Sequence, residues 1–218
     1  MARSFRKDIR EPDSFQALAA WASDFYRAYA KIILGVVAGA LLLGGGYLGY
    51  SAWDAQIRED ASLALAIARG KSPDGPEAEE SLKKAADEFP GTKSGTIAGL
   101  RLAMLLRERG DHQGAEREYR KLLGAGNLVN TDLEIARRGL AGSLSLQSKC
   151  DEAVSIWRDI LAAGSLLTPE DIYISMAGCL EESGKSAEAL KVYEELIQKH
   201  PGSPFITAQL RARMRALE

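Results

Sequence analysis

The sequence predicts an all-α fold in which a single N-terminal transmembrane helix precedes an α-solenoid, a stack of helical hairpins. Residues 32–53 form an uncharged, glycine-rich apolar stretch of 22 residues. After this stretch the apolar residues recur at helical spacing, without the long alternation typical of β-strands. The prolines, which helix interiors tolerate poorly, all lie at expected helix boundaries: Pro12, Pro73, Pro76, Pro90, Pro169, Pro201 and Pro204.

The stretch 32–53 has the length of a transmembrane helix. Its 22 residues would span ~33 Å as a helix, and the hydrocarbon core of a bilayer is ~30 Å thick. Aromatic residues that favour the membrane interface flank both ends: Tyr26, Tyr29, Tyr47, Tyr50 and Trp53. The alternatives are a buried core helix and a cleaved signal peptide, whose apolar region is normally only ~7–15 residues long. We expect an uncleaved membrane anchor.

Residues 1–31 are expected to form a short cytoplasmic segment that contains an amphipathic helix. Pro12-Asp13-Ser14 offers a helix start. Aromatic and apolar residues follow on one helical face: Phe15, Leu18, Trp21, Phe25 and Tyr29. This helix could lie in the plane of the membrane interface, or it could simply continue the anchor helix into the cytoplasm. The sequence leaves both arrangements open.

The distribution of Lys and Arg predicts the orientation of the anchor. Six basic residues precede it, and three occur in the 20 residues after it. Because the basic flank of a span stays in the cytoplasm, we expect residues 54–218 to be exported, in a bacterium to the periplasmic side of the inner membrane. The chain has a net charge of −2 and no basic cluster, which argues against a nucleic-acid partner.

Residues 170–203 carry the pattern of a paired-helix repeat. Counted from Glu170, a large residue stands at position 4, small residues at 8 and 20, an aromatic at 24 and a proline at 32: Tyr173, Ala177, Ala189, Tyr193 and Pro201. This pattern resembles the tetratricopeptide repeat, in which small residues allow two helices to cross closely. Three further copies precede it, so we expect repeats near 59–92, 96–129, 134–167 and 170–203, followed by a capping helix at 204–218.

The copies are not equally complete. The first has Leu82 instead of an aromatic at position 24 and carries Ser-Pro-Asp-Gly-Pro in its turn. The third has Ser148 at position 15, where the second and fourth copies have glycine. We therefore expect the first pair of helices to be an imperfect hairpin that joins the anchor to the array.

The sequence contains no motif of a catalytic, cofactor-binding or metal site. His112 and His200 each stand alone at an expected turn or helix end. Cys150 and Cys179 could form a disulfide in an oxidising compartment, but we favour two unpaired small apolar residues. We expect a protein that is not an enzyme and that uses no cofactor or metal.

A stack of such hairpins has a concave face lined by the first helix of each repeat. In the repeat family the groove positions are roughly 2, 5, 9 and 12. They correspond here to Ile97, Leu100, Met104, Arg107, Ile135, Arg138, Ser145, Ile174 and Glu181. This mixture suits an extended polypeptide, although half of the set could equally be core residues. Reversing Arg107 and Arg138 to Glu is expected to weaken partner binding without unfolding the domain.

The order of segments resembles the ancillary Sec-translocon subunit family, as does the opening from Arg3 to Phe15. The resemblance implies a scaffold or chaperone-like subunit whose partners are translocon subunits, exported polypeptides or chaperones, with membrane lipid around its span. One alternative is a scaffold for envelope assembly or cell division. Another, less well supported, is an enzyme with an unrecognised site.

Overall fold

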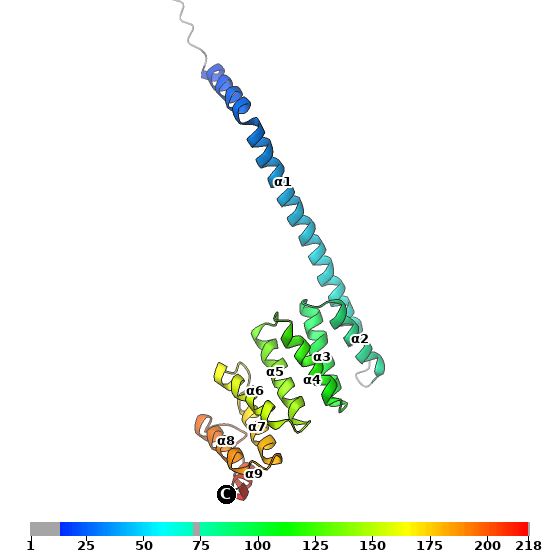
Figure 1. Cartoon of the computed structure of the whole chain (residues 1–218), viewed down its shortest axis with the longest axis vertical. Helices are drawn as coiled ribbons and strands as arrows, with labels where there is room; N and C mark the ends of the chain where they lie inside the picture. Colours follow the sequence, from blue (N-terminus) through cyan, green and yellow to red (C-terminus); the bar gives the residue numbers. More distant parts are fainter. Residues whose placement is uncertain (1–13, 72–74, 218) are drawn as a thin grey trace, which may run out of the picture. The chain divides into compact units, whose positions relative to one another are not determined.

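The computed structural model describes residues 14–71 and 75–217. Most of the Arg3–Phe15 opening and part of the turn after the first helix therefore lie outside the described residues. The described chain is helical, and its elements follow one another in space (Figure 1): α1 (Ser14–Arg69), α2 (Pro76–Glu88), α3 (Lys93–Glu108), α4 (His112–Gly124), α5 (Asn130–Ser145), α6 (Cys150–Ala163), α7 (Glu170–Glu182), α8 (Ser186–Lys199) and α9 (Ala208–Leu217).

The chain divides into two compact units, Met1–Ala55 and Gln56–Glu218. The first unit contains the N-terminal part of α1, in which the amphipathic stretch and the apolar stretch form one continuous helix. Within the described residues, one helical stretch, Leu34–Arg69, is long and apolar enough to cross a membrane. None of the residues in its most apolar part is buried.

The second unit is built of successive helical hairpins. The C-terminal end of α1 precedes α2, and α3–α4, α5–α6 and α7–α8 form the hairpins that follow, with α9 packed on α8. The small residues at position 8, Ala103, Ala141 and Ala177, are fully buried, which allows the close helix crossings expected from the sequence. In the first copy the corresponding Ala66 is exposed, and Leu65 and Ala68 are buried in its place. The first hairpin therefore departs from the pattern of the others.

The turn at position 15 requires a left-handed backbone. Gly110 and Gly184 meet this requirement with φ values of 85° and 75°. Ser148 occupies the same position in the third repeat with φ 61°, although it carries a Cβ. The turn therefore keeps its left-handed backbone without a glycine. We infer that the packing of the two helices imposes this conformation on Ser148.

Ion pairs join the second helix of one repeat to the next repeat. Lys121 pairs with Asp87, and Lys185 pairs with Asp151, each across 34 residues of sequence. Arg120 of α4 reaches Glu152 of α6 at 2.5 Å. Each of these three pairs joins two successive units, and together they help to hold the register between repeats.

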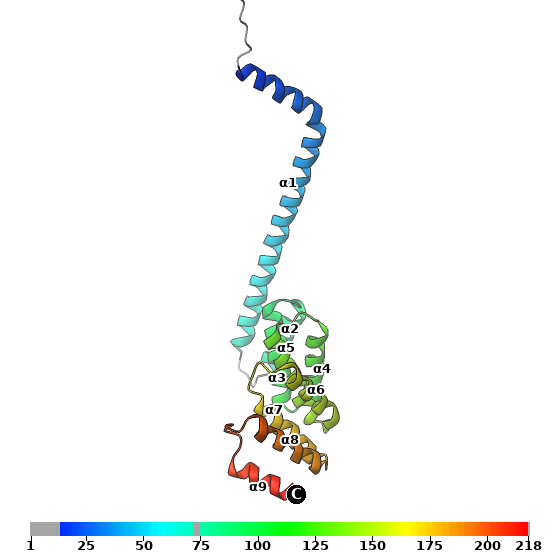
Figure 2. The same ribbon diagram turned by 90° about the vertical axis from the view of Figure 1, so that its left-hand side faces the viewer.

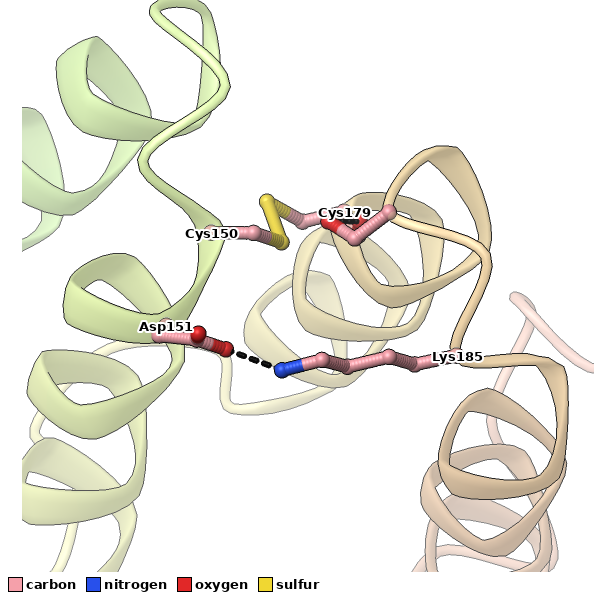
Figure 3. The surroundings of a disulfide bond; sticks show 5 residues. Cys150, Asp151, Cys179 and Lys185 are labelled. Atoms are coloured by element: carbon pink, nitrogen blue, oxygen red, sulfur yellow. Dashed lines mark hydrogen bonds and ion pairs between the residues drawn. A yellow bond between two sulfur atoms is a disulfide. The ribbon is translucent and has the colours of Figure 1, made fainter.

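Cys150 at the start of α6 and Cys179 near the end of α7 form a disulfide, with their Cα atoms 5.7 Å apart. Both side chains are buried, and the Lys185–Asp151 ion pair lies beside them (Figure 3). The expectation of two unpaired cysteines is therefore wrong. The sequence could not reveal the pairing, because it depends on how close the stacking of the third and fourth repeats brings two residues 29 positions apart.

Candidate groove for a polypeptide

The first helices of the repeats line a pocket of about 290 Å³. Its walls are formed by Met104 and Arg107 of α3, Ile135 and Arg138 of α5, and Asp171, Ile172 and Ser175 of α7. Tyr119 and Trp157, the aromatic residues of position 24, are almost fully buried and form its base. The pocket therefore combines an apolar base with charged side chains at its rim.

A second pocket of about 410 Å³ adjoins the first. It lies between the C-terminal end of α1, α2 and α3, and Met104 lines both pockets. Met104 is 40% exposed, so a ligand in either pocket can reach its side chain. We refer to the two pockets together as the groove.

Four of the nine predicted site residues line the groove: Met104, Arg107, Ile135 and Arg138. The other five lie elsewhere. Leu100 belongs to the core, Ile97 and Ile174 pack against it, and Ser145 and Glu181 stand near the C-terminal ends of their helices.

A fixed set of repeat positions misses the rest of the groove because the groove crosses the helices obliquely. In this pocket α3 contributes positions 9 and 12, α5 contributes 2, 5, 6 and 9, and α7 contributes 2, 3 and 6. The residues of this first pocket that the sequence missed are Gly139, Gly142, Asp171, Ile172 and Ser175, together with the two aromatics at the base. Among these residues, only the Gly139-x-x-Gly142 spacing could have been recognised in the sequence. Two glycines on one face of a helix allow another group to approach its backbone closely.

Arg138 is fixed by a polar network instead of being presented to a ligand. Its guanidinium lies 2.7 Å from Asp171 and 2.8 Å from Glu134, and it donates hydrogen bonds to Ser165 Oγ and the carbonyl of Thr168. Only 14% of the Arg138 side chain is exposed. Arg138→Glu is therefore expected to destabilise the fold, because it would place a third carboxylate beside Glu134 and Asp171.

Glu134 is the buried centre of this network. It accepts hydrogen bonds from Ser165 Oγ, the Leu166 N–H and Arg138. Burial alone would raise the pKa of Glu134, but these donors outweigh it and hold the pKa below its usual value. The network ties the α6–α7 connection to α5 and thereby positions the α7 wall of the groove.

The remaining groove arginines are available to a ligand. Among the residues that the structure describes, no carboxylate forms an ion pair with Arg69, Arg101 or Arg107. Glu108 also lines the second pocket, and Lys71 there pairs with Glu77. The groove consequently presents more unpaired positive than negative charge, which favours an acidic ligand.

Glu181 has a structural role as well. It accepts a hydrogen bond from Tyr193 Oη at 2.7 Å and pairs with Arg213 of α9 at 2.8 Å. These contacts attach the last helix to the fourth repeat. Within the part of the chain that the structure describes, no group of three or more His, Cys, Asp or Glu residues could hold a metal ion.

A family model described as a tetratricopeptide repeat-like domain matches residues 23–217. No curated protein matches the chain. A crystal structure of nearly identical tetratricopeptide-like repeats, from a protein described as a kinesin light chain of Podospora anserina, superposes with a TM-score of 0.52 at 16% sequence identity, covering 74% of this chain and 94% of that chain. At this identity the similarity concerns the fold alone. The family model, however, covers most of the sequence, and the chain therefore belongs to the tetratricopeptide repeat-like domain family.

Proposed function

We propose that this protein is a membrane-tethered scaffold that binds extended segments of other polypeptides in the groove of its repeat domain. The observation that carries the proposal is the pair of pockets that meet at the exposed Met104. Their apolar bases suit apolar side chains, and the unpaired Arg101 and Arg107 suit acidic ones. Repeat domains of this family mediate contacts between proteins, which agrees with this use of the groove.

Binding of a labelled peptide tests the groove. The probe is a ten-residue peptide of alternating Leu and Asp, and its affinity for the full chain in detergent is followed by fluorescence anisotropy. Arg107→Glu is expected to weaken binding about tenfold, since it replaces an attractive charge with a repulsive one (about 1.4 kcal/mol). Arg117→Glu is the matched control, because Arg117 is an exposed arginine of α4 outside both pockets. Equal affinities of the two variants would place the binding surface elsewhere.

We further propose that residues 32–53 cross the bacterial inner membrane, with a cytoplasmic N-terminus and a periplasmic repeat domain. The excess of Lys and Arg before the anchor supports this orientation. The Cys150–Cys179 disulfide supports it too, because thiols in the cytosol are kept reduced. When cells are lysed directly into denaturant and the chain is alkylated, we expect no cysteine to be modified before reduction and two to be modified after it. Two reactive thiols without reduction, or an active cytoplasmic reporter at the C-terminus, would contradict the orientation.

The finer role that we propose is an accessory subunit of the Sec translocon or a chaperone-like factor for exported chains. The support is the resemblance in segment order and in the Arg3–Phe15 opening. Purification of the intact protein in mild detergent is expected to recover translocon subunits, and recovery should decline with Arg107→Glu if the groove makes the contact. Recovery of division or outer-membrane assembly proteins without a translocon subunit would favour the alternative scaffold and exclude this role.

A further inference from the structure

Three aromatic rings form a ladder on the N-terminal part of α1. The rings of Trp21 and Phe25 have centroids 5.5 Å apart, and those of Phe25 and Tyr29 are 4.8 Å apart. All three side chains are exposed, by 65%, 46% and 47%. Leu18 and Ile32, also exposed, extend the same helical face in both directions.

The opposite face of this stretch is polar. Asp24, Arg27 and Lys31 lie there, and no charged residue interrupts the aromatic face between Leu18 and Ile32. Within Met1–Ala55 the described chain consists of α1 alone, so the aromatic face has no other helix of its own unit to pack against. An amphipathic helix with such a face needs an apolar surface from outside the unit.

The shape of α1 indicates which surface this is. Figure 2 shows that the dark-blue N-terminal part of α1 runs at a marked angle to the part that follows it. Without a bend, residues 14–31 would project about 27 Å out of a membrane crossed by residues 32–53, and the aromatic face would be left in water. A bend is therefore required for this face to lie against the lipid next to the first residues of the span.

We propose that residues 18–31 form an interfacial anchor that lies along the cytoplasmic surface of the bilayer, with Trp21, Phe25 and Tyr29 inserted at the headgroup level. The proposal rests on the membrane span proposed above. We assign lipid as the partner of the aromatic face because this face continues directly into the apolar stretch. The two surfaces are therefore expected to contact the same membrane. Trp and Tyr suit this depth, since their rings are apolar and their N–H and O–H groups stay hydrated.

The position of Trp21 in the membrane tests the anchor. The chain contains three tryptophans, and Trp53→Phe with Trp157→Phe leaves Trp21 as the single fluorophore. The full chain is reconstituted into vesicles of phosphatidylethanolamine and phosphatidylglycerol that carry brominated lipids at defined depths. Trp21 is expected to emit at short wavelength and to be quenched most strongly by bromine near the headgroups. Emission as in water, with full quenching by iodide, would overturn the proposal.

A matched control places the fluorophore on the polar face. In a chain with Trp21→Phe, Trp53→Phe and Trp157→Phe, the further substitution Arg27→Trp is expected to give a tryptophan that iodide reaches and brominated lipids quench weakly. Equal lipid quenching of both positions would contradict an in-plane helix, since a helix that continues the span exposes both faces equally.

Two further outcomes are distinguishable. A short-wavelength emission of Trp21 that disappears when the protein is diluted into excess lipid would show that a second copy covers the aromatic face, and would overturn the proposal. Release of the whole chain from the vesicles at alkaline pH would instead contradict the span itself and with it the proposed function. Retention in the membrane with Trp21 in water would leave the span intact and refute only the interfacial anchor.

Discussion

Two glycines of α5 illustrate how single residues shape the groove. A Cβ on Gly139 would lie 2.2 Å from Cζ of Tyr119, which is almost fully buried beneath the groove. A Cβ on Gly142, one turn further along, would meet only the Arg107 guanidinium, at 3.4 Å. Packing therefore requires glycine at position 139, whereas position 142 at the groove surface has room for a small side chain.

Alanine at these two positions is expected to change stability in opposite directions. Gly139→Ala should lower the free energy of unfolding by about 1–3 kcal/mol, because the Tyr119 ring must shift in a packed core. Gly142→Ala should raise it by up to about 1 kcal/mol through higher helix propensity. Denaturant unfolding followed by circular dichroism measures both. The same sign for the two variants would contradict the packing argument.

Glu116 of α4 connects two repeats through its carboxylate. It accepts hydrogen bonds at 2.8 Å from Lys149 and from Gln147, and it pairs with Arg120 at 3.0 Å. The hydrogen bond from Lys149 is the largest cause of a pKa for Glu116 of about 2, against an ordinary value of 4.5. Its contribution to stability is therefore present above pH 4.5 and is lost as the pH falls toward 2.

Glu116→Gln is expected to lower the free energy of unfolding at pH 7 by about 1 kcal/mol and to flatten its decline between pH 4.5 and 2. Urea unfolding at a series of pH values measures this dependence. Glu80→Gln, at an exposed glutamate of α2, serves as the control and should follow the wild-type curve. If Glu116→Gln also follows that curve, the network does not stabilise the folded state.

At the scale of elements, hydrogen bonds, an ion pair and a disulfide together hold the region around the α6–α7 connection. The connection between α6 and α7 is tied to α5 by Glu134 and Arg138 on one side. The Cys150–Cys179 disulfide and the Lys185–Asp151 ion pair join the third and fourth repeats on the other (Figure 3). Because α7 supplies one wall of the groove, this junction also determines the width of the groove.

Removal of the disulfide is expected to destabilise the repeat domain. With Cys150→Ser and Cys179→Ser together, the free energy of unfolding should fall by about 3 kcal/mol, because the bond restrains a 29-residue loop in the unfolded chain. Reduction of the wild-type protein should lower its unfolding midpoint to that of the double variant, whereas the midpoint of the double variant should not change with reductant. An unchanged wild-type midpoint after reduction would show that the bond contributes nothing.

At the scale of the whole molecule, the repeat unit contains its own core. The buried apolar cluster runs from Leu65 in the last turns of α1 to Leu210 in α9. It lies entirely within the unit Gln56–Glu218. Stacked hairpins of this kind depend on contacts with their neighbours, so the core needs no part of the first unit.

The fragment 56–218 is therefore expected to fold without the membrane anchor. Expressed alone, it should be soluble and monomeric in size-exclusion chromatography, with a cooperative loss of helical circular dichroism on heating. The fragment 76–218, which lacks the last turns of α1 and with them Leu65 and Ala68, should melt at a lower temperature. Equal melting temperatures would contradict the assignment of these turns to the repeat core.

Part of the site could be predicted from the repeat pattern. Met104, Arg107, Ile135 and Arg138, which the repeat pattern places on the first helices, do line the first pocket; that they bind a ligand stays a prediction. The residues of α7 were not, since each repeat is rotated relative to the one before it and the groove crosses each helix at a different height. The role of Arg138 could not be foreseen either, because three of its partners, Ser165, Thr168 and Asp171, lie in the next connection and helix.

The sequence by itself determined the helical fold, the repeat period and the apolar stretch, because these follow from local spacing of apolar, small and proline residues. The tertiary structure decided which of those residues meet across repeats: the Cys150–Cys179 bond, the network around Glu134, and the two pockets joined at Met104. Such contacts depend on the rotation between successive hairpins. That rotation results from the packing of side chains on all neighbouring helices together, so no local stretch of sequence encodes it.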